Sequence, residues 1–174
     1  MFRLAKYEEL DIVIDIYDRL AGHLEENINY SHWKKGVYPV AETAEDGIKG
    51  NSLFVLVDES IENKIVGSVI LNSDQPAQYE NAPFDKRFKG SEVLVIHTLV
   101  VDPMYLRNNI GWAIMCSIDK YAVSNGFKTI RLDTYYKNTP ASGLYEKAGY
   151  NLVGLFDLEL GFKGLFKLYE KVLC

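Results

Sequence analysis

The sequence has little cysteine and no long apolar run. Only 2 of its 174 residues are Cys, Cys116 and Cys174, and no C-x-x-C pair occurs. This count argues against a disulfide framework and against a metal site. No apolar stretch is long enough to span a bilayer, and no charged leader with an apolar core is present. We therefore expect a protein that stays in the reducing cytoplasm.

Two common phosphate-binding loops are also absent. The sequence contains neither G-x-x-x-x-G-K-[ST] nor G-x-G-x-x-G, which disfavours a nucleotide triphosphatase and a dinucleotide dehydrogenase. There are 19 Lys and Arg against 24 Asp and Glu, a net charge of −5. This balance disfavours nucleic acid or an anionic membrane as the main partner. With 48% hydrophobic residues, the chain is predicted to form one globular domain, residues 1–174. Its oligomeric state, monomer or homodimer, stays open.

The most informative stretch runs from Glu92 to Gly126. Val93–Val101 is almost entirely apolar and β-branched, which predicts a strand buried in the middle of a sheet. Asp102-Pro103 ends the strand, because proline cannot continue a central ladder. A helix with one apolar face is predicted from near Ile110 to the stop at Asn125-Gly126.

The turn between this strand and this helix is a candidate anion site. The first N–H groups of a helix have no partner within the helix, and its dipole favours negative charge there. Arg107 adds a positive charge, and Gly111 allows close approach to the backbone. The alternative is a plain strand–helix connection with a capped helix, and this stretch alone favours neither interpretation.

Patterns elsewhere predict an α/β (α+β) fold, a mixed sheet of six to seven strands flanked by helices. The segment Ser73–Gly90 has no periodic pattern and is predicted to be a loop. The expected elements are strands at Phe2–Ala5, Ser52–Asp58, Lys64–Asn72, Lys128–Thr134, Tyr150–Leu158 and Leu165–Val172, helices from Glu8 to about Leu24, over Ala41–Lys49 and over Asn138–Ala148, and turns at Glu59–Asn63 and Gly161–Gly164.

The stretch HTLVVDPMYLRNNIGWAIM resembles the acetyl-CoA-binding motif of the GCN5-related N-acetyltransferase (GNAT) superfamily. In that family an aromatic residue precedes [QR]-x-x-G-x-[GA] at a helix start, and the six positions fall on Leu106 to Gly111. Leu106 replaces the usual Gln or Arg, and Asn109 replaces the first Gly. Asn tolerates positive φ, so we expect the turn to form and to bind pyrophosphate less tightly. The segment NTPASGLYEKAGY, Asn138–Tyr150, is similar to the family's second block, N-x-x-A-x-x-L-Y-x-x-x-G-[FY].

The resemblance implies the acyl-CoA N-acyltransferase fold, whose mixed, mostly antiparallel sheet has a splayed parallel strand pair that holds the pantetheine arm of the cosubstrate. Backbone groups of Leu99 and Val101 would pair with the arm, and a bulge at Thr98–Val100 would aim an N–H at the thioester carbonyl. The residues predicted to bind acetyl-CoA are Leu99, Val100, Val101, Leu106, Arg107, Asn108, Asn109, Ile110, Gly111, Trp112, Asn138 and Ala141.

The implied activity is transfer of an acetyl group from acetyl-CoA to a primary amine, by direct attack through a tetrahedral intermediate. Tyr145 is the candidate acid that protonates the departing thiolate, because a phenol is neutral at pH 7. The alternative is a packed tyrosine whose hydroxyl is satisfied by the protein. The base that deprotonates the amine is Glu92, His97 or Asp133, or a water chain replaces all three. Glu92 is alternatively a solvated strand end, His97 a core histidine and Asp133 a structural anchor for the neighbouring loop.

The acceptor amine itself is not named by the sequence. A small amine, a protein N-terminus and a lysine are all open. The resemblance places the acceptor site near Asn27–Gly50, where Trp33 and Tyr38 would offer aromatic faces to a cationic amine. Trp33 alternatively only packs a lid over the sheet. A non-catalytic acyl-CoA-binding sensor is the competing function, and a cofactor-free α/β domain is a more distant one.

Overall fold

The structure is a computed structural model that describes residues 1–158 and 164–173. The chain forms two compact units, which are described separately. Unit 1 comprises Met1–Leu71 and His97–Ser117, and unit 2 comprises Asn72–Ile96 and Ile118–Cys174. The strand β4 (Val93–Val101) and the helix α3 (Ile110–Ser124) each contribute residues to both units. The predicted turn at Gly161–Gly164 falls largely on residues 159–163, outside the described residues.

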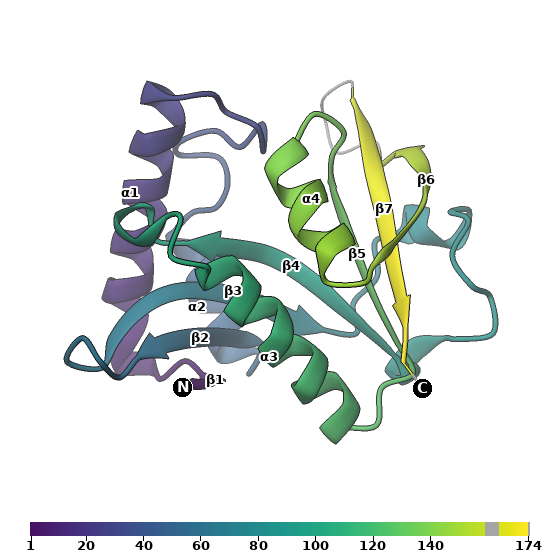
Figure 1. The fold of residues 1–174 in the computed structure, drawn as a ribbon, viewed down its shortest axis with the longest axis horizontal. Coiled ribbons are helices and arrows are strands. Elements are labelled where there is room, and N and C mark those ends of the chain that lie inside the picture. The colour runs from purple at the N-terminus through teal and green to yellow at the C-terminus, as the bar shows by residue number, and fades with distance from the viewer. Residues whose placement is uncertain (159–163, 174) are drawn as a thin grey trace. The chain divides into compact units, whose positions relative to one another are not determined.

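The fold prediction is confirmed. The sheet has seven strands in the order β1-β2-β3-β4-β5-β7-β6, with one parallel pair, β4 and β5, paired over Val93–Val95 and Thr129–Arg131. The four helices are α1 (Leu10–Glu26), α2 (Ala41–Lys49), α3 and α4 (Thr139–Lys147), and the other strands are β1 (Phe2–Leu4), β2 (Leu53–Asp58), β3 (Lys64–Asn72), β5 (Thr129–Tyr135), β6 (Asn151–Asp157) and β7 (Leu165–Val172) (Figure 1).

In unit 1 the helices α1 and α2 cover one face of the strands β2 and β3. Val13, Ile16 and Tyr17 of α1 are buried against alternate residues of β2. Leu10, Ile14 and Leu20 of the same helix pack on this cluster as well. Each such apolar side chain stabilises the fold by roughly 1.5–3 kcal/mol when fully buried. The apolar residues on one face of β2 therefore hold α1 on the sheet.

The first turns of α3 pack on the opposite face of β3. A Cβ atom on Gly67 would lie 2.8 Å from the carbonyl oxygen of Val100 and 2.9 Å from Cδ1 of Ile114. Only glycine fits at this position, because every other residue would clash with the β4 backbone. Consecutive residues of a strand point to opposite faces, so the neighbouring Ser68 faces α1. Gly67 thus allows the first turns of α3 to pack closely on β3 and β4. The predicted anion-binding turn joins the end of β4 to α3.

In unit 2 the segment between β3 and β4 is more ordered than predicted. The sequence predicts a loop over Ser73–Gly90, but the structure forms short 3-10 helices, η2 (Ala77–Glu80) and η3 (Gly90–Glu92). Tyr79, Ala82 and Phe84 are buried against β4 and β7. The apolar residues of this segment do not recur at helix or strand spacing, so the sequence did not predict their burial.

A buried ion pair fastens this segment to the sheet of unit 2. Arg131 on β5 donates to Glu170 on β7 at 2.7 Å, and both side chains are about 5% exposed. The same guanidinium donates to Oε1 of Gln75 and to the carbonyl of Asp85, both at 2.7 Å, and lies over the ring of Phe84. Since a buried charge is costly unless it is fully hydrogen-bonded, these contacts explain why an arginine is tolerated here.

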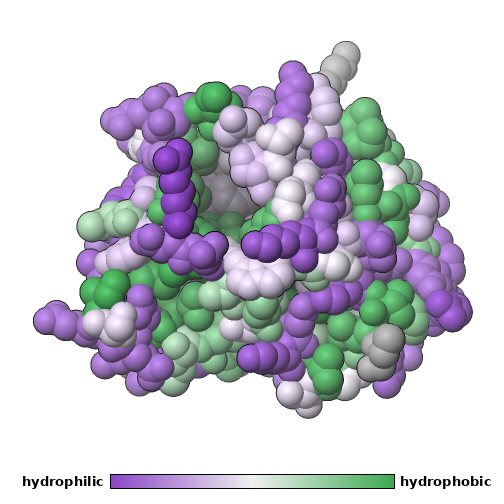
Figure 2. Space-filling model, in the orientation of Figure 1, coloured by the Kyte–Doolittle hydropathy of each residue, from purple (hydrophilic) through white to green (hydrophobic). Residues whose placement is uncertain are grey.

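Other element boundaries differ slightly from the predictions. The helix α4 starts at Thr139, one residue after the predicted start, with Asn138 as its N-cap. The outermost strand, β6, carries the exposed side chains Leu152 and Leu155, and Figure 2 shows apolar surface over β6 and β7. None of the described helices is both long and apolar enough to cross a membrane.

Candidate active site

The predicted site residues lie in both units. Unit 1 holds the end of β4, the turn before α3 and the segment with Trp33 and Tyr38. Unit 2 holds the candidate acid Tyr145 and the candidate bases Glu92 and Asp133. Each group of residues is described within its own unit.

The second half of β4 is irregular where the bulge is predicted. Thr98 is buried and has a φ of +47°, in the left-handed region that β-branched residues rarely enter. A residue in this conformation interrupts the regular strand geometry and reorients the following peptide groups. Leu99 and Val101 are half-buried and Val100 is buried.

An ion pair that the sequence did not predict holds the end of β4. Asp102 is fully buried and accepts from Nε and a terminal nitrogen of Arg19 on α1, at 3.1 and 2.7 Å. Its Oδ1 also accepts from the backbone N–H of Met104 at 3.1 Å. These bonds raise the pKa of the Arg19 guanidinium. The first residue after β4 is thereby fixed to the helix that covers the sheet.

The turn from Leu106 to Asn109, which the sequence predicts to be an anion site, is exposed. Arg107 and Asn109 have φ values of +67° and +57°, so Asn109 does take the left-handed conformation expected of a residue that replaces glycine. The helix α3 begins at Ile110, as predicted, and the first N–H groups of an α-helix find no carbonyl acceptor within the helix itself. These backbone donors together with Arg107 fit a pyrophosphate, whereas Leu106 contributes no donor.

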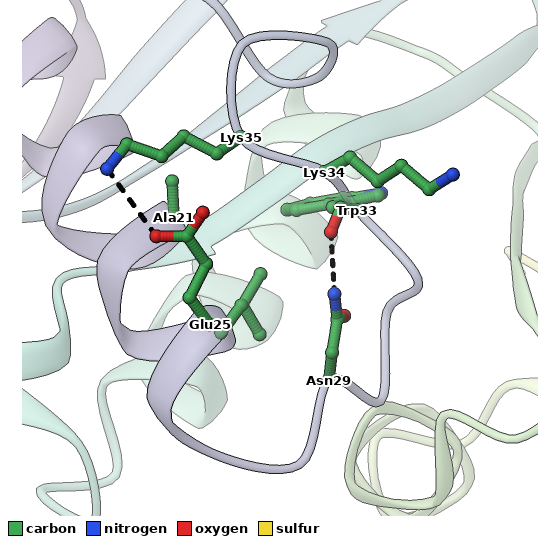
Figure 3. A pocket seen from close by; sticks show the side chains of 7 residues that line it. Ala21, Glu25, Asn29, Trp33, Lys34 and Lys35 are labelled. Carbon is green, nitrogen blue, oxygen red and sulfur yellow. Dashed lines mark hydrogen bonds and ion pairs between the residues drawn. The ribbon is translucent and has the colours of Figure 1, made fainter.

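A pocket of about 260 Å³ lies beside α1 in unit 1 (Figure 3). Trp33 forms one wall, where Nδ2 of Asn29 donates to its carbonyl at 2.6 Å. Glu25, which would favour a cationic ligand, is 3.5 Å from the ammonium group of Lys35. The lining residues are Ala21, Leu24, Glu25, Asn29, Trp33, Lys34 and Lys35. The charges of this pocket are therefore mixed, and the expected preference for a cation has less support than the sequence suggested.

Tyr38 lies next to this pocket and reaches the irregular part of β4. Its ring contacts Trp33 edge to face, with centroids 5.5 Å apart, and its hydroxyl is hydrogen-bonded to the Thr98 hydroxyl. Two more hydroxyls, those of Tyr17 and Ser68, are buried nearby without a hydrogen bond among the described residues. Burial raises the pKa of Tyr17 to about 12, a rise that Ser68 partly offsets.

In unit 2 the side chain of Tyr145 is 8% exposed and packs on the rings of Tyr150 and Tyr169. Burial raises its pKa, and the charge of Asp133 adds to the rise. Its hydroxyl has no hydrogen-bond partner in the part of the chain that the structure describes. The alternative interpretation of Tyr145, a packed tyrosine with a satisfied hydroxyl, gains no hydrogen bond from the described residues.

The candidate bases have different surroundings. Asp133 accepts a 2.6 Å hydrogen bond from the hydroxyl of Tyr79, which lies in η2. Burial raises the pKa of Asp133, and the Tyr79 bond partly offsets this rise. Glu92 is exposed and lies in η3, directly before the first residue of β4. Its carboxylate accepts from the Lys89 N–H at 3.3 Å. His97 is half-buried on β4.

The second sequence block forms the start of α4. Asn138 caps this helix, because its Oδ1 accepts from the Ala141 N–H at 3.4 Å while its Nδ2 donates to Thr134 at 3.0 Å. Both ends of the Asn138 side chain are thus in use within unit 2. Among the described residues no three His, Cys, Asp or Glu side chains are grouped to hold a metal ion.

The sequence profile of the Acetyltransferase (GNAT) family matches residues 15–150. The chain therefore belongs to the GNAT acetyltransferase family, which uses acetyl-CoA. The resemblance drawn from the two sequence blocks is confirmed, as is the assignment to N-acetyltransferase enzymes.

Solved structures of the same fold cover nearly the whole chain. A candidate acetyltransferase of Staphylococcus aureus Mu50 is 25% identical, with a TM-score of 0.70 over 99% of this chain and 98% of that one. A GNAT-family acetyltransferase of Streptococcus agalactiae 2603 is 17% identical (TM-score 0.76, 99% and 95% covered). The ribosomal-protein-S18-alanine N-acetyltransferase of Escherichia coli is 15% identical (TM-score 0.68, 98% and 91% covered). No curated protein sequence matches the chain.

Proposed function

We propose that the chain transfers an acetyl group from acetyl-CoA to a primary amine by direct attack, with Tyr145 as the general acid. The observation that carries this proposal is the Tyr145 phenol, which is largely buried among aromatic rings and whose hydroxyl has no hydrogen-bond partner among the described residues. A phenol is protonated at neutral pH, so the hydroxyl can give its proton to a leaving thiolate. A tyrosine kept only for packing gains nothing from a hydroxyl without a partner.

Residues of unit 1 supply the other roles in this proposal. The exposed turn at Arg107–Asn109 and the start of α3 bind the phosphates of acetyl-CoA. Backbone N–H groups near Thr98–Val100 stabilise the oxyanion that forms when the amine attacks the thioester carbonyl. Both roles are supported by the positive φ values of Thr98 and Asn109, which expose peptide groups that a regular strand or helix would use internally.

The acceptor is proposed to enter at the pocket beside Trp33. Its volume of about 260 Å³ is just below the usual range of roughly 300–1,000 Å³ for ligand pockets, which favours a small amine over a long stretch of polypeptide.

The Trp33→Leu substitution tests this site, because it keeps apolar bulk and removes the aromatic face. We expect a raised KM for the acceptor and an unchanged Kd for acetyl-CoA, whereas a lower Tm with both constants intact would make Trp33 a packing residue only.

The test of the activity is a thiol-release assay with acetyl-CoA over small amines, lysine side chains and peptide N-termini. We expect thiol release with at least one acceptor, and a kcat about 100-fold lower in Tyr145→Phe. The control is Tyr150→Phe, which removes a buried hydroxyl that already donates to Asp119 at 3.2 Å and should change Tm rather than kcat. Acetyl-CoA binding without thiol release from any acceptor would refute catalysis and indicate a sensor.

A further inference from the structure

Thr98 occupies a conformation that its side chain does not favour. It lies inside β4, is 6% exposed and has a φ of +47°. Threonine is β-branched, so this region is more costly for it than for asparagine or glycine. A residue persists in such a conformation only where its surroundings determine it. The contacts of Thr98 therefore show what holds this part of the strand.

The Thr98 hydroxyl is held by a residue from outside the sheet. It is hydrogen-bonded to the Tyr38 hydroxyl, 60 residues earlier in the sequence. Tyr38 belongs to the connection between α1 and α2 rather than to a neighbouring strand. Ladder hydrogen bonds to other strands favour regular β geometry, whereas a side-chain bond from a separate segment can stabilise a local departure from it.

Tyr38 is itself fixed in two ways. Its backbone N–H donates to the Lys34 carbonyl at 3.0 Å, which closes a tight turn. Its ring meets Trp33 edge to face, with an interplanar angle of 80°, a favoured arrangement of aromatic rings. Trp33 is anchored in turn by the bond from Asn29 (Figure 3). The Tyr38 hydroxyl thus has a defined position from which to hold Thr98.

We propose that Tyr38 is a positioning residue for acetyl transfer: its hydroxyl holds Thr98 in the left-handed conformation that orients the oxyanion-stabilising N–H of β4. This inference rests on the proposed function, in which that N–H acts on the thioester carbonyl. It assigns Tyr38 a role in the rate of the chemical step in place of the expected role in acceptor binding.

The test compares substitutions on both sides of the hydrogen bond. Tyr38→Phe and Thr98→Val each remove one hydroxyl and keep the shape of the side chain, while Thr98→Ser keeps the bond. Tyr30→Phe is the matched control, because Tyr30 lies in the same connection, is as exposed as Tyr38 (37% each) and has no side-chain hydrogen bond among the described residues.

We expect kcat to fall at least about tenfold in Tyr38→Phe and in Thr98→Val, less than the roughly 100- to 1,000-fold effect of deleting an oxyanion donor outright. The double variant should lose no more than either single variant, Thr98→Ser should recover most of the kcat that Thr98→Val loses, and Tyr30→Phe should retain wild-type kcat. Acceptor KM and acetyl-CoA Kd should change less than about twofold. The infrared carbonyl frequency of bound acetyl-CoA, labelled with 13C at the thioester carbonyl, should shift toward its value in solution in the two slow variants.

Three results would overturn the inference while leaving the proposed activity intact: wild-type kcat in Tyr38→Phe, a raised acceptor KM as its main defect, or a loss that Thr98→Val does not reproduce. If Thr98→Val does not fold, the kcat of Tyr38→Phe is compared with that of Thr98→Ser, and equal values would overturn the inference. Wild-type protein that acetylates no amine would refute the proposed function instead. Amide hydrogen exchange over residues 97–101 then tests the hydrogen bond alone, and equal exchange in wild type and Tyr38→Phe would refute it.

Discussion

Replacing Asp102 with Ala should destabilise the protein by about 2–3 kcal/mol. The change removes the acceptor of two Arg19 bonds and of the Met104 N–H, all within 3.1 Å. Removing one partner of a buried ion pair costs about 3–5 kcal/mol, and losing an N-cap acceptor costs about 1 kcal/mol. The Arg19 side chain is 36% exposed, so water compensates part of its lost pairing, which lowers the expected sum. Asp102→Asn keeps one acceptor oxygen and should cost about 1 kcal/mol.

Urea unfolding measures these differences. With an m-value of about 2 kcal/mol/M, Asp102→Ala should lower the midpoint by about 1–1.5 M and Asp102→Asn by about 0.5 M. Arg19→Met completes a double-mutant cycle, and we expect a coupling free energy above about 1 kcal/mol. A midpoint for Asp102→Ala within about 0.3 M of wild type, or additive effects in the cycle, would show that the pair does not hold the end of β4.

Three further outcomes are expected. Asn109→Gly should leave the Kd for acetyl-CoA unchanged or lower it in calorimetry, because glycine adopts the φ of +57° at no steric cost; weaker binding would give the amide a direct role. Arg131→Met should lower the unfolding free energy in urea by about 3–5 kcal/mol, because it leaves the buried Glu170 carboxylate without its counter-charge. An effect below about 1 kcal/mol would contradict this account. Burial raises the folded-state pKa of Asp133, so its ionisation destabilises the fold as pH rises from its ordinary pKa through the folded value. The Asp133→Asn side chain still accepts from Tyr79 but cannot ionise. This variant should therefore have a higher Tm than wild type at pH values above the folded-state pKa of Asp133, and the difference in Tm should shrink as pH falls. A difference in Tm that does not depend on pH would contradict the raised pKa of Asp133.

Local patterns were sufficient to predict the elements around the candidate site. Ala41–Lys49 and Val93–Val101 have the predicted bounds, and α3 begins at the predicted Ile110. Each of these signals is carried by residues close together in the sequence: an apolar period, a Pro, or a helix stop. The positive φ of Asn109 was also predictable from a single residue. Asn109 stands where the family motif has a glycine, and asparagine tolerates positive φ.

The contacts that hold the site were not predictable in this way. Arg19 and Asp102 are 83 residues apart, and Tyr79 and Asp133 are 54 apart. A charged or hydroxyl residue in a sequence of this composition has many potential partners, and only the tertiary arrangement selects one. The bond between Tyr38 and Thr98 belongs to the same class. The sequence pattern therefore identified Trp33 and Tyr38 as aromatic faces without revealing where the Tyr38 hydroxyl is bound.

The buried tyrosines of unit 2 give the clearest contrast between structure and function. Tyr79, Tyr150 and Tyr169 each donate to a carboxylate, at distances of 2.6, 3.2 and 2.9 Å. Tyr145 packs among the same rings without any such partner in the described residues. A carboxylate bonded to the Tyr145 hydroxyl would satisfy it and would also remove the proton donor that a thiolate needs. A phenol without a hydrogen-bond partner among the described residues adds little to stability and still holds a proton that it can donate, which is why the proposed catalytic role fits Tyr145 better than its neighbours.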